Sequence, residues 1–362
     1  MKIKLYNLET SSKTKQLFQK KIDKLIKTSD WILGDEVEQF ENNLKSYIGS
    51  KYALGVNSGT DALEISLRAL NIKKGDEVIV PAYSFFATSE VVLKLDATPV
   101  YSDISKKDLN LNISEIKKLI TKKTKAVIPV HLFGNPVNMI DLKNEINDNR
   151  IFIVEDVAQA FGSSLDNKML GNHGTTGCFS FYPTKNLGDF GDAGAITTNN
   201  KKLYEKMLIL RNHGQKKRYY HTEIGYNSRL DNIQAAILNI KIQQIKEIET
   251  QKVKNINYYY NLLSDESTVK ILGSKNQPLN QLPIEFKIRK KLINVKKKLE
   301  INNIEYGKYY PYGLHEFKIS KHNTNNILEN IDWAKKSTIT LPCHEELKLS
   351  DIEKICEIIK KS

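Results

Sequence analysis

Residues 151–198, IFIVEDVAQAFGSSLDNKMLGNHGTTGCFSFYPTKNLGDFGDAGAITT, decide the fold of this chain. The stretch begins with the apolar run Ile151–Val154 and reaches the carboxylate Asp156 two residues later. Such a run indicates a parallel strand buried on both faces, and ligands bind at the carboxyl ends of parallel strands. Further along, Lys185 lies in a loop that is rich in glycine. We therefore expect the carboxylate and the amine to face one pocket.

The composition is that of a globular protein. The chain has 362 residues, of which 40% are hydrophobic and 27% charged, so one large domain with a smaller companion is expected. Its apolar stretches are shorter than the roughly 20 residues of a membrane helix, and its N-terminus has no secretory apolar core. The three cysteines are far apart, so neither a disulfide framework nor a metal site is predicted. We expect a cytoplasmic protein without membrane insertion.

The formal net charge of +13 has two interpretations. An excess of lysine can attract a polyanion such as nucleic acid, or it can simply form a solvated surface. The densest lysine cluster, residues 287–299, mixes lysines with apolar residues as an amphipathic helix does. Sequence motifs of nucleic-acid binding are absent, so no nucleic-acid partner is predicted.

Predicted strands alternate with helical segments, which indicates an α/β fold. A long helix from Asp231 to about residue 262 is expected to bridge two domains. We place the boundary at its middle, which divides the chain into a large domain, 1–245, and a small C-terminal α+β domain, 246–362. The strands expected in the large domain are Tyr52–Val56 and segments near residues 80, 100, 126–130, 153 and 195.

Two further positions have the chemistry of a ligand site, each with an ordinary alternative. The turn Asn57–Thr60 joins a strand to a helix, where free N–H groups and the helix dipole attract anions. A plain helix cap explains the same residues equally well. Phe85 follows a strand end, where its ring can stack on a flat ligand or pack in the core.

Together these residue types suit pyridoxal phosphate (PLP). This cofactor needs a lysine for a Schiff base, a carboxylate at its pyridine nitrogen and a phosphate cradle. Lys185, Asp156 and the Asn57–Thr60 turn with Ser180 can supply them. The alternative is a surface lysine in a glycine-rich loop, which is the commoner case.

Motifs along nearly the whole chain resemble the DegT/DnrJ/EryC1/StrS family of PLP-dependent sugar aminotransferases. The resemblance implies PLP-transferase fold type I, with a large α/β domain around a mostly parallel central sheet and a small C-terminal α+β domain. It also implies transaminase activity. The motifs are ILGDEVEQFE, VNSGTDAL, GDEVIVPAYSFFAT, TKAVIPVHLFGNPVNM, VEDVAQAFGS, FSFYPTKNLG, RNHGQ and GYNSRLDNIQAAIL, with looser matches at YYPYGLHE and ITLPCHEEL.

The resemblance also implies roles for single residues. Lys185 would hold PLP covalently and later move a proton, Asp156 would pair with the pyridinium nitrogen, and Phe85 would stack on the ring. A homodimer with shared active sites would form, because one phosphate contact comes from the neighbouring subunit. The remaining implied contacts are Gln159 at the ring oxygen, Gly59, Thr60 and Ser180 at the phosphate, Asn227 at the phosphate from the neighbouring subunit, and Arg229, Tyr309 and Tyr310 at the substrate.

The implied reaction moves an amino group from L-glutamate to a keto-sugar of a dTDP- or UDP-linked hexose. Related sugar 3-dehydratases carry histidine at the lysine position, so Lys185 favours transamination. The motifs are most similar to members that aminate C3, and nucleotide-sugar 4-aminotransferases are the alternative. The pathway implied is surface polysaccharide (O-antigen) or amino-sugar biosynthesis. A non-enzymatic regulatory or nucleic-acid-binding protein on the same fold remains a further alternative, although it would need neither Lys185 nor Asp156.

Two positions depart from the family pattern. Residues 308–311 are Lys-Tyr-Tyr-Pro, where the family often has Val-His-Tyr-Pro, and this would alter contacts with the sugar. Ala193 stands where glycine is usual, which matters only if the backbone there needs a positive φ.

Overall fold

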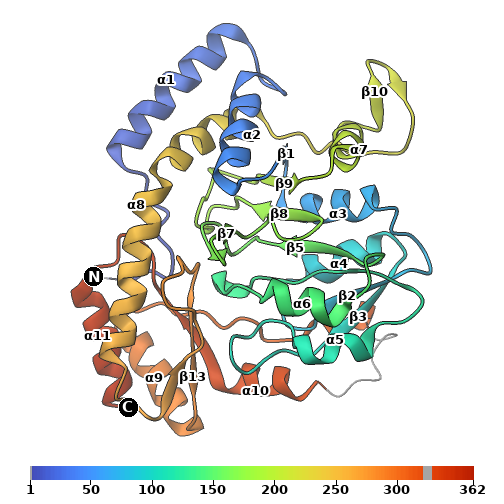
Figure 1. Cartoon of the computed structure of the whole chain (residues 1–362). Helices are drawn as coiled ribbons and strands as arrows, with labels where there is room; N and C mark the ends of the chain where they lie inside the picture. Colours follow the sequence, from blue (N-terminus) through green and yellow to red (C-terminus); the bar gives the residue numbers. More distant parts are fainter. Residues whose placement is uncertain (1, 321–327) are drawn as a thin grey trace.

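The computed structural model of this protein describes residues 2–320 and 328–362. Within these residues the central sheet has seven strands in the order β1-β9-β8-β5-β4-β2-β3 (Figure 1). All neighbours from β8 to β3 pair in parallel, and β9 is antiparallel to both of its neighbours. The mostly parallel sheet predicted from the sequence is confirmed. The strands are β1 (Tyr52–Val56), β2 (Glu77–Pro81), β3 (Thr98–Ser102), β4 (Thr124–Val127), β5 (Phe152–Asp156), β8 (Thr176–Ser180) and β9 (Gly194–Thr198).

Helices cover both faces of this sheet, because successive strand residues point to opposite sides. In β5, Val154 packs into the cluster formed with α3, α4 and α7, whereas Ile153 packs into the cluster formed with α5 and α6. Towards β1 and β8, the second face is covered by α2 and α8. The helices are α1 (Ser12–Thr28), α2 (Asp35–Ile48), α3 (Gly59–Ala69), α4 (Ala87–Lys94), α5 (Ile113–Leu119), α6 (Met139–Ile146), α7 (Lys201–Arg211) and α8 (Asn232–Leu262).

The C-terminal part forms a separate antiparallel sheet with helices packed on it. Helix α8 runs without interruption from the large sheet to this part (Figure 1). Its Ile245 belongs to the cluster with α2, and its Ile256 to the C-terminal cluster, which Ile3 also joins. The division at residue 246 stays a prediction. The elements are β12 (Val269–Ile271), β13 (Leu282–Phe286), α9 (Arg289–Ile301), α10 (Glu329–Ser337), β14 (Thr338–Leu341) and α11 (Leu349–Lys360).

Two features of the large domain differ from the sequence prediction. The predicted strand 126–130 ends at Val127, because Pro129 has no N–H for the ladder and only a single bridge, Val130 to Asp156, follows it. Strand β8 is absent from the prediction, since its small residues have no strand-like alternation. The described residues also form two short hairpins: β6 (Ser164–Leu165) with β7 (Lys168–Met169), and β10 (Gln215–Lys217) with β11 (Tyr220–His221).

One edge of the sheet gathers the loops that matter for function. Strands β1, β2, β5 and β8 run in the same direction, so their carboxyl ends meet at this edge, and β9 begins there. The loop 181–193 between β8 and β9 therefore lies at the same edge and brings Lys185 with it. In the part of the chain that the structure describes, no helix combines the length and apolarity needed to cross a membrane.

Candidate active site

The carboxylate of Asp156 lies at the carboxyl end of β5 and is only 6% exposed. Its Oδ1 accepts a hydrogen bond from the N–H of Ala158 at 3.1 Å, and its Oδ2 accepts one from the hydroxyl of Thr88 at 3.2 Å. Burial raises the pKa of Asp156 above its ordinary value, although these bonds and the charge of Lys185 oppose the rise. A carboxylate in this position is stabilised in its ionised form by a cationic partner.

Lys185 lies in the loop that joins β8 to β9 and is held by the hydrogen bond from its N–H to the carbonyl of Tyr182 at 2.8 Å. Burial lowers the pKa of Lys185 to about 8, and the negative charge of Asp156 opposes this effect. With that pKa, roughly a tenth of the amine is neutral at pH 7. A neutral amine is a nucleophile towards a carbonyl, so Lys185 has the reactivity expected of a Schiff-base lysine.

The turn before α3 fits tightly against the ends of β8 and β9. A Cβ on Gly59 would lie 2.6 Å from the Cβ of Ser180, and a Cβ on Gly194 would lie 2.3 Å from the carbonyl oxygen of Ser58. The first N–H groups of a helix have no partner within the helix. Gly59, Thr60 and Ser180 are thus brought together at a helix N-terminus, which has the geometry of a phosphate cradle.

Gln159 forms hydrogen bonds to Phe133 and to Tyr310 of the C-terminal part of the chain. Its Oε1 accepts from the N–H of Phe133 at 2.7 Å, and its Nε2 donates to the hydroxyl of Tyr310 at 3.0 Å. Burial first, and then the nearby charge of Asp156, raise the pKa of Tyr310 above its ordinary value. The hydroxyl of Tyr309 faces elsewhere, 3.2 Å from that of Tyr6. The structure thus bonds Gln159 to Tyr310, whose phenol lies near the charge of Asp156, and directs Tyr309 towards the N-terminal segment.

The other predicted residues have no side-chain hydrogen bond to this group among the described residues. Phe85 is 62% exposed, so one face of its ring is available to a ligand. Asn227 is exposed on the segment that follows hairpin β10–β11. Arg229 Nη1 donates to Asn212 Oδ1 at 2.9 Å.

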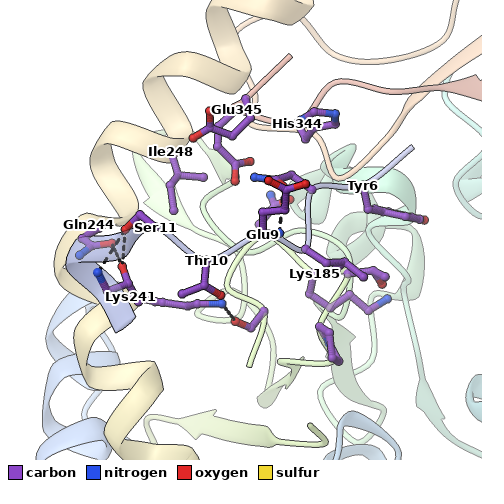
Figure 2. A pocket seen from close by; sticks show the side chains of 18 of the residues that line it. Tyr6, Glu9, Thr10, Ser11, Lys185, Lys241, Gln244, Ile248, His344 and Glu345 are labelled. Carbon is purple, nitrogen blue, oxygen red and sulfur yellow. Dashed lines mark hydrogen bonds between the residues drawn. The ribbon is translucent and has the colours of Figure 1, made fainter. Parts of the chain in front are cut away.

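A cavity of about 670 Å³ opens beside Lys185 (Figure 2). Figure 2 shows Lys185 and Tyr6 on one side, helix α8 with Lys241 and Gln244 on the other, and His344 and Glu345 above. Lys185 is the single predicted site residue in its lining. The cavity therefore reaches the site through the lysine loop, whereas the Asp156 group lies deeper in the fold.

Sequence reasoning missed two residues of this site. Thr88 bonds to Asp156 from the first turn of α4, the helix that follows β2 in the chain. Its position at the shared sheet edge is a signal that could have revealed it. Tyr6 meets Tyr309 across 303 residues of chain, and no local pattern indicates that contact.

Comparison with known proteins identifies the family. Residues 12–360 match the model of the DegT/DnrJ/EryC1/StrS aminotransferase family, and the chain belongs to that family. The resemblance seen in the motifs, the fold class and the aminotransferase activity that it implied are thereby confirmed.

Relatives and a solved structure extend over nearly the whole chain. The UDP-N-acetyl-3-dehydro-alpha-D-glucosamine 3-aminotransferase of Acidithiobacillus ferrooxidans is 34% identical over 343 residues, which cover 94% of this chain and 92% of that protein. A pleiotropic regulatory protein of Geobacillus stearothermophilus is 35% identical over 350 residues, 94% and 93% of the two chains. The crystal structure of NtdA from Bacillus subtilis, with bound cofactor PMP, has a TM-score of 0.92 at 26% identity and covers 99% of this chain and 85% of that one.

The perturbed amine of Lys185 can be measured directly. After reductive ¹³C-methylation of the cofactor-free protein, we expect the signal of Lys185 to titrate with a midpoint at about 8, against an ordinary value of 10.5. In Asp156→Asn the midpoint should fall further, because the carboxylate charge that favours the ammonium is removed. Asp148→Asn, which removes a carboxylate that pairs with Arg150 at the surface, is the matched control and should leave the midpoint unchanged. A midpoint near 10.5 for Lys185 in the chain without substitutions would contradict the prediction.

Proposed function

We propose that this protein uses PLP to move an amino group from L-glutamate to the keto group of a dTDP- or UDP-linked hexose, at C3 of the sugar. The observation that carries the proposal is a lysine with a pKa of about 8 beside a buried carboxylate, at the sheet edge that also holds the Gly59–Ser180 cradle. The relative from A. ferrooxidans, a 3-aminotransferase by name, supports the choice of C3. The product would enter surface polysaccharide, such as O-antigen, or another amino-sugar pathway.

The residues fit the cofactor in charge, space and reactivity. When bound, PLP supplies an electron sink for the reacting carbon. Lys185 would hold it covalently and then carry a proton between the substrate carbon and the cofactor. Asp156 would pair with the ring nitrogen, and the N–H groups of Gly59 and Thr60 with the Ser180 hydroxyl would bind the phosphate. The PMP bound in NtdA supports the choice of cofactor.

The ring would lie between side chains of this chain. Phe85 has an exposed ring that can stack on it. The amide of Gln159 has two N–H groups, of which one donates to Tyr310, so the second can donate to the ring oxygen.

We also propose a homodimer in which each site is completed by its partner. Asn227 would reach the phosphate bound by the neighbouring subunit, and its exposure on the segment after the protruding hairpin β10–β11 supports this (Figure 1). Tyr219 and Tyr220 of that hairpin are 81% and 55% exposed, which is unusual for large aromatic side chains unless another surface covers them. Arg229, Tyr309 and Tyr310 would contact the substrate.

Two alternatives remain distinguishable. A nucleotide-sugar 4-aminotransferase would use the same residues on a differently oriented sugar. A regulatory protein is favoured by the name of the Geobacillus relative. It would need neither a reactive lysine nor a desolvated carboxylate, and retention of both argues for the enzyme.

Covalent cofactor binding is the first test. Purified protein incubated with PLP should show a visible imine band that borohydride abolishes, and peptide mapping should find the added mass on Lys185. Lys185→Ala should lose both signals. Lys241→Ala is the matched control, because Lys241 lines the same cavity and donates to the carbonyl of Gly188. Loss of the band in both variants, or its absence from the unchanged protein, would refute the proposal.

The choice of keto carbon can be measured by comparing two keto forms of the same nucleotide sugar. With glutamate as donor, we expect the 3-keto form of a UDP- or dTDP-hexose to be aminated and the 4-keto form of the same sugar to react at least tenfold more slowly, equivalent to about 1.4 kcal/mol. Formation of 2-oxoglutarate and mass spectrometry of the sugar product give the readout. Faster amination at C4 would instead establish the 4-aminotransferase.

Shared active sites can be tested by mixing inactive variants. Lys185→Ala and Asn227→Ala should each lose activity, the second because PLP binding weakens. In a mixed dimer one of the two sites combines the intact lysine of one chain with the intact asparagine of the other. Random pairing makes about half of the dimers mixed, so activity should return to about a quarter of that of the unsubstituted protein. If the mixture stays inactive while mixed dimers are present, Asn227 does not act across the interface.

A further inference from the structure

A chain of hydroxyl groups ends on the carboxylate of Asp156. The hydroxyl of Thr88 lies 3.2 Å from Asp156 Oδ2, and the hydroxyl of Ser84 lies 2.9 Å from that of Thr88. All three side chains are buried, with exposures of 6% for Asp156, 1% for Thr88 and 4% for Ser84. Bulk water therefore contributes little to stabilising this carboxylate, and the protein must supply the donors.

Hydrogen-bond chemistry fixes the direction of this chain. An ionised carboxylate only accepts, so Thr88 must donate its proton to Asp156. The oxygen of Thr88 is then free to accept, and the proton of Ser84 points at it. With the N–H of Ala158 on Oδ1, each carboxylate oxygen has one donor. Both bonds favour the ionised form over the protonated one.

The other charged groups near Asp156 do not replace Thr88. Lys185 is the nearby cation, but in the proposed reaction its amine is engaged in covalent binding and proton transfer. His131 Nδ1 accepts from the N–H of Val137 at 3.0 Å, so its proton is on Nε2 and is directed at Glu155, 3.2 Å away. The phenol of Tyr310 is near Asp156 and donates no bond to it among the described contacts.

We propose that Thr88, oriented by Ser84, is a positioning residue that keeps Asp156 ionised and turned towards the cofactor ring nitrogen. This inference rests on the proposed function, in which that nitrogen must stay protonated. Thr88 has no direct contact with the substrate in this scheme. Its effect passes through the carboxylate, which shares one proton with the ring nitrogen.

The test places a reporter on the shared proton. PLP labelled with ¹⁵N in its ring is bound to the unchanged protein and to Thr88→Val, which has the same shape without the hydroxyl. We expect the ring ¹⁵N shift of Thr88→Val at neutral pH to move towards the unprotonated value, because the proton affinity of Asp156 rises. Thr88→Ser, which restores the donor, should return the shift. In Thr88→Val, kcat should fall about tenfold while the KM for the keto-sugar stays unchanged. This corresponds to a tenfold change in the equilibrium of the shared proton between Asp156 and the ring nitrogen.

Two further variants separate positioning from stability. Thr197→Val removes another fully buried hydroxyl, one that donates to the carbonyl of Gly171 at 2.6 Å, and should lower the melting temperature without moving the ¹⁵N shift. Ser84→Ala should move the ¹⁵N shift in the same direction as Thr88→Val by a smaller amount. It replaces Thr88→Val as the test variant if Thr88→Val does not fold.

The outcomes divide cleanly. An unchanged ¹⁵N shift in Thr88→Val, or in Ser84→Ala if it alone folds, overturns the inference even when stability falls. A shift of equal size in Thr197→Val also overturns it, since the effect would then be general. Failure of the unchanged protein to bind PLP overturns the proposed function and this inference together, whereas normal binding with an insensitive shift overturns the inference alone.

Discussion

The burial of the Asp156 carboxylate is the constraint on which the rest of the site depends. Removing a carboxylate from water costs several kcal/mol unless hydrogen bonds and a cation compensate it. The protein provides two hydrogen bonds, from Ala158 and Thr88, and the nearby amine of Lys185. Burial also lowers the pKa of that amine, so part of it is uncharged. Each member of the pair is therefore perturbed towards its neutral form. A cationic ring nitrogen would restore the balance for the carboxylate and release the lysine for chemistry.

Close backbone packing at the sheet edge supports this pair. Gly59 and Gly194 allow the turn before α3 to touch the ends of β8 and β9, where side chains would collide. The same edge tolerates one departure from the family pattern. Ala193 is buried at 1% exposure and is not among the residues with positive φ, so a methyl group there introduces no backbone strain. Glycine is thus required where two backbones meet, and not throughout the loop.

Much of this arrangement could be predicted from local patterns. Strand β1 was expected at its observed bounds, and the apolar run Ile151–Val154 before Asp156 identified β5, because both are short, buried and flanked by turn residues. Strand β8 was not predicted, since Gly177 at its centre is not typical of a strand. The glycine is needed there because its backbone lies against that of Gly171. The bond from Thr88 to Asp156 joins residues 68 positions apart. A local pattern can place each of these residues beyond a strand end, but the strand order that brings the two together is not encoded locally.

The second departure, tyrosine at position 309, acts through a contact of this kind. The hydroxyl of Tyr309 meets that of Tyr6, which in turn accepts a hydrogen bond from Gln281 Nε2. Tyr6 also lines the cavity beside Lys185. A side chain at 309 therefore sets the position of the N-terminal segment as well as its own contacts. Burial and the bond to Tyr309 both raise the pKa of Tyr6, so this phenol stays protonated and the link persists over the working pH range. Residue 309 can thus change the shape of the cavity wall while the Asp156 group, held by different bonds, stays as it is.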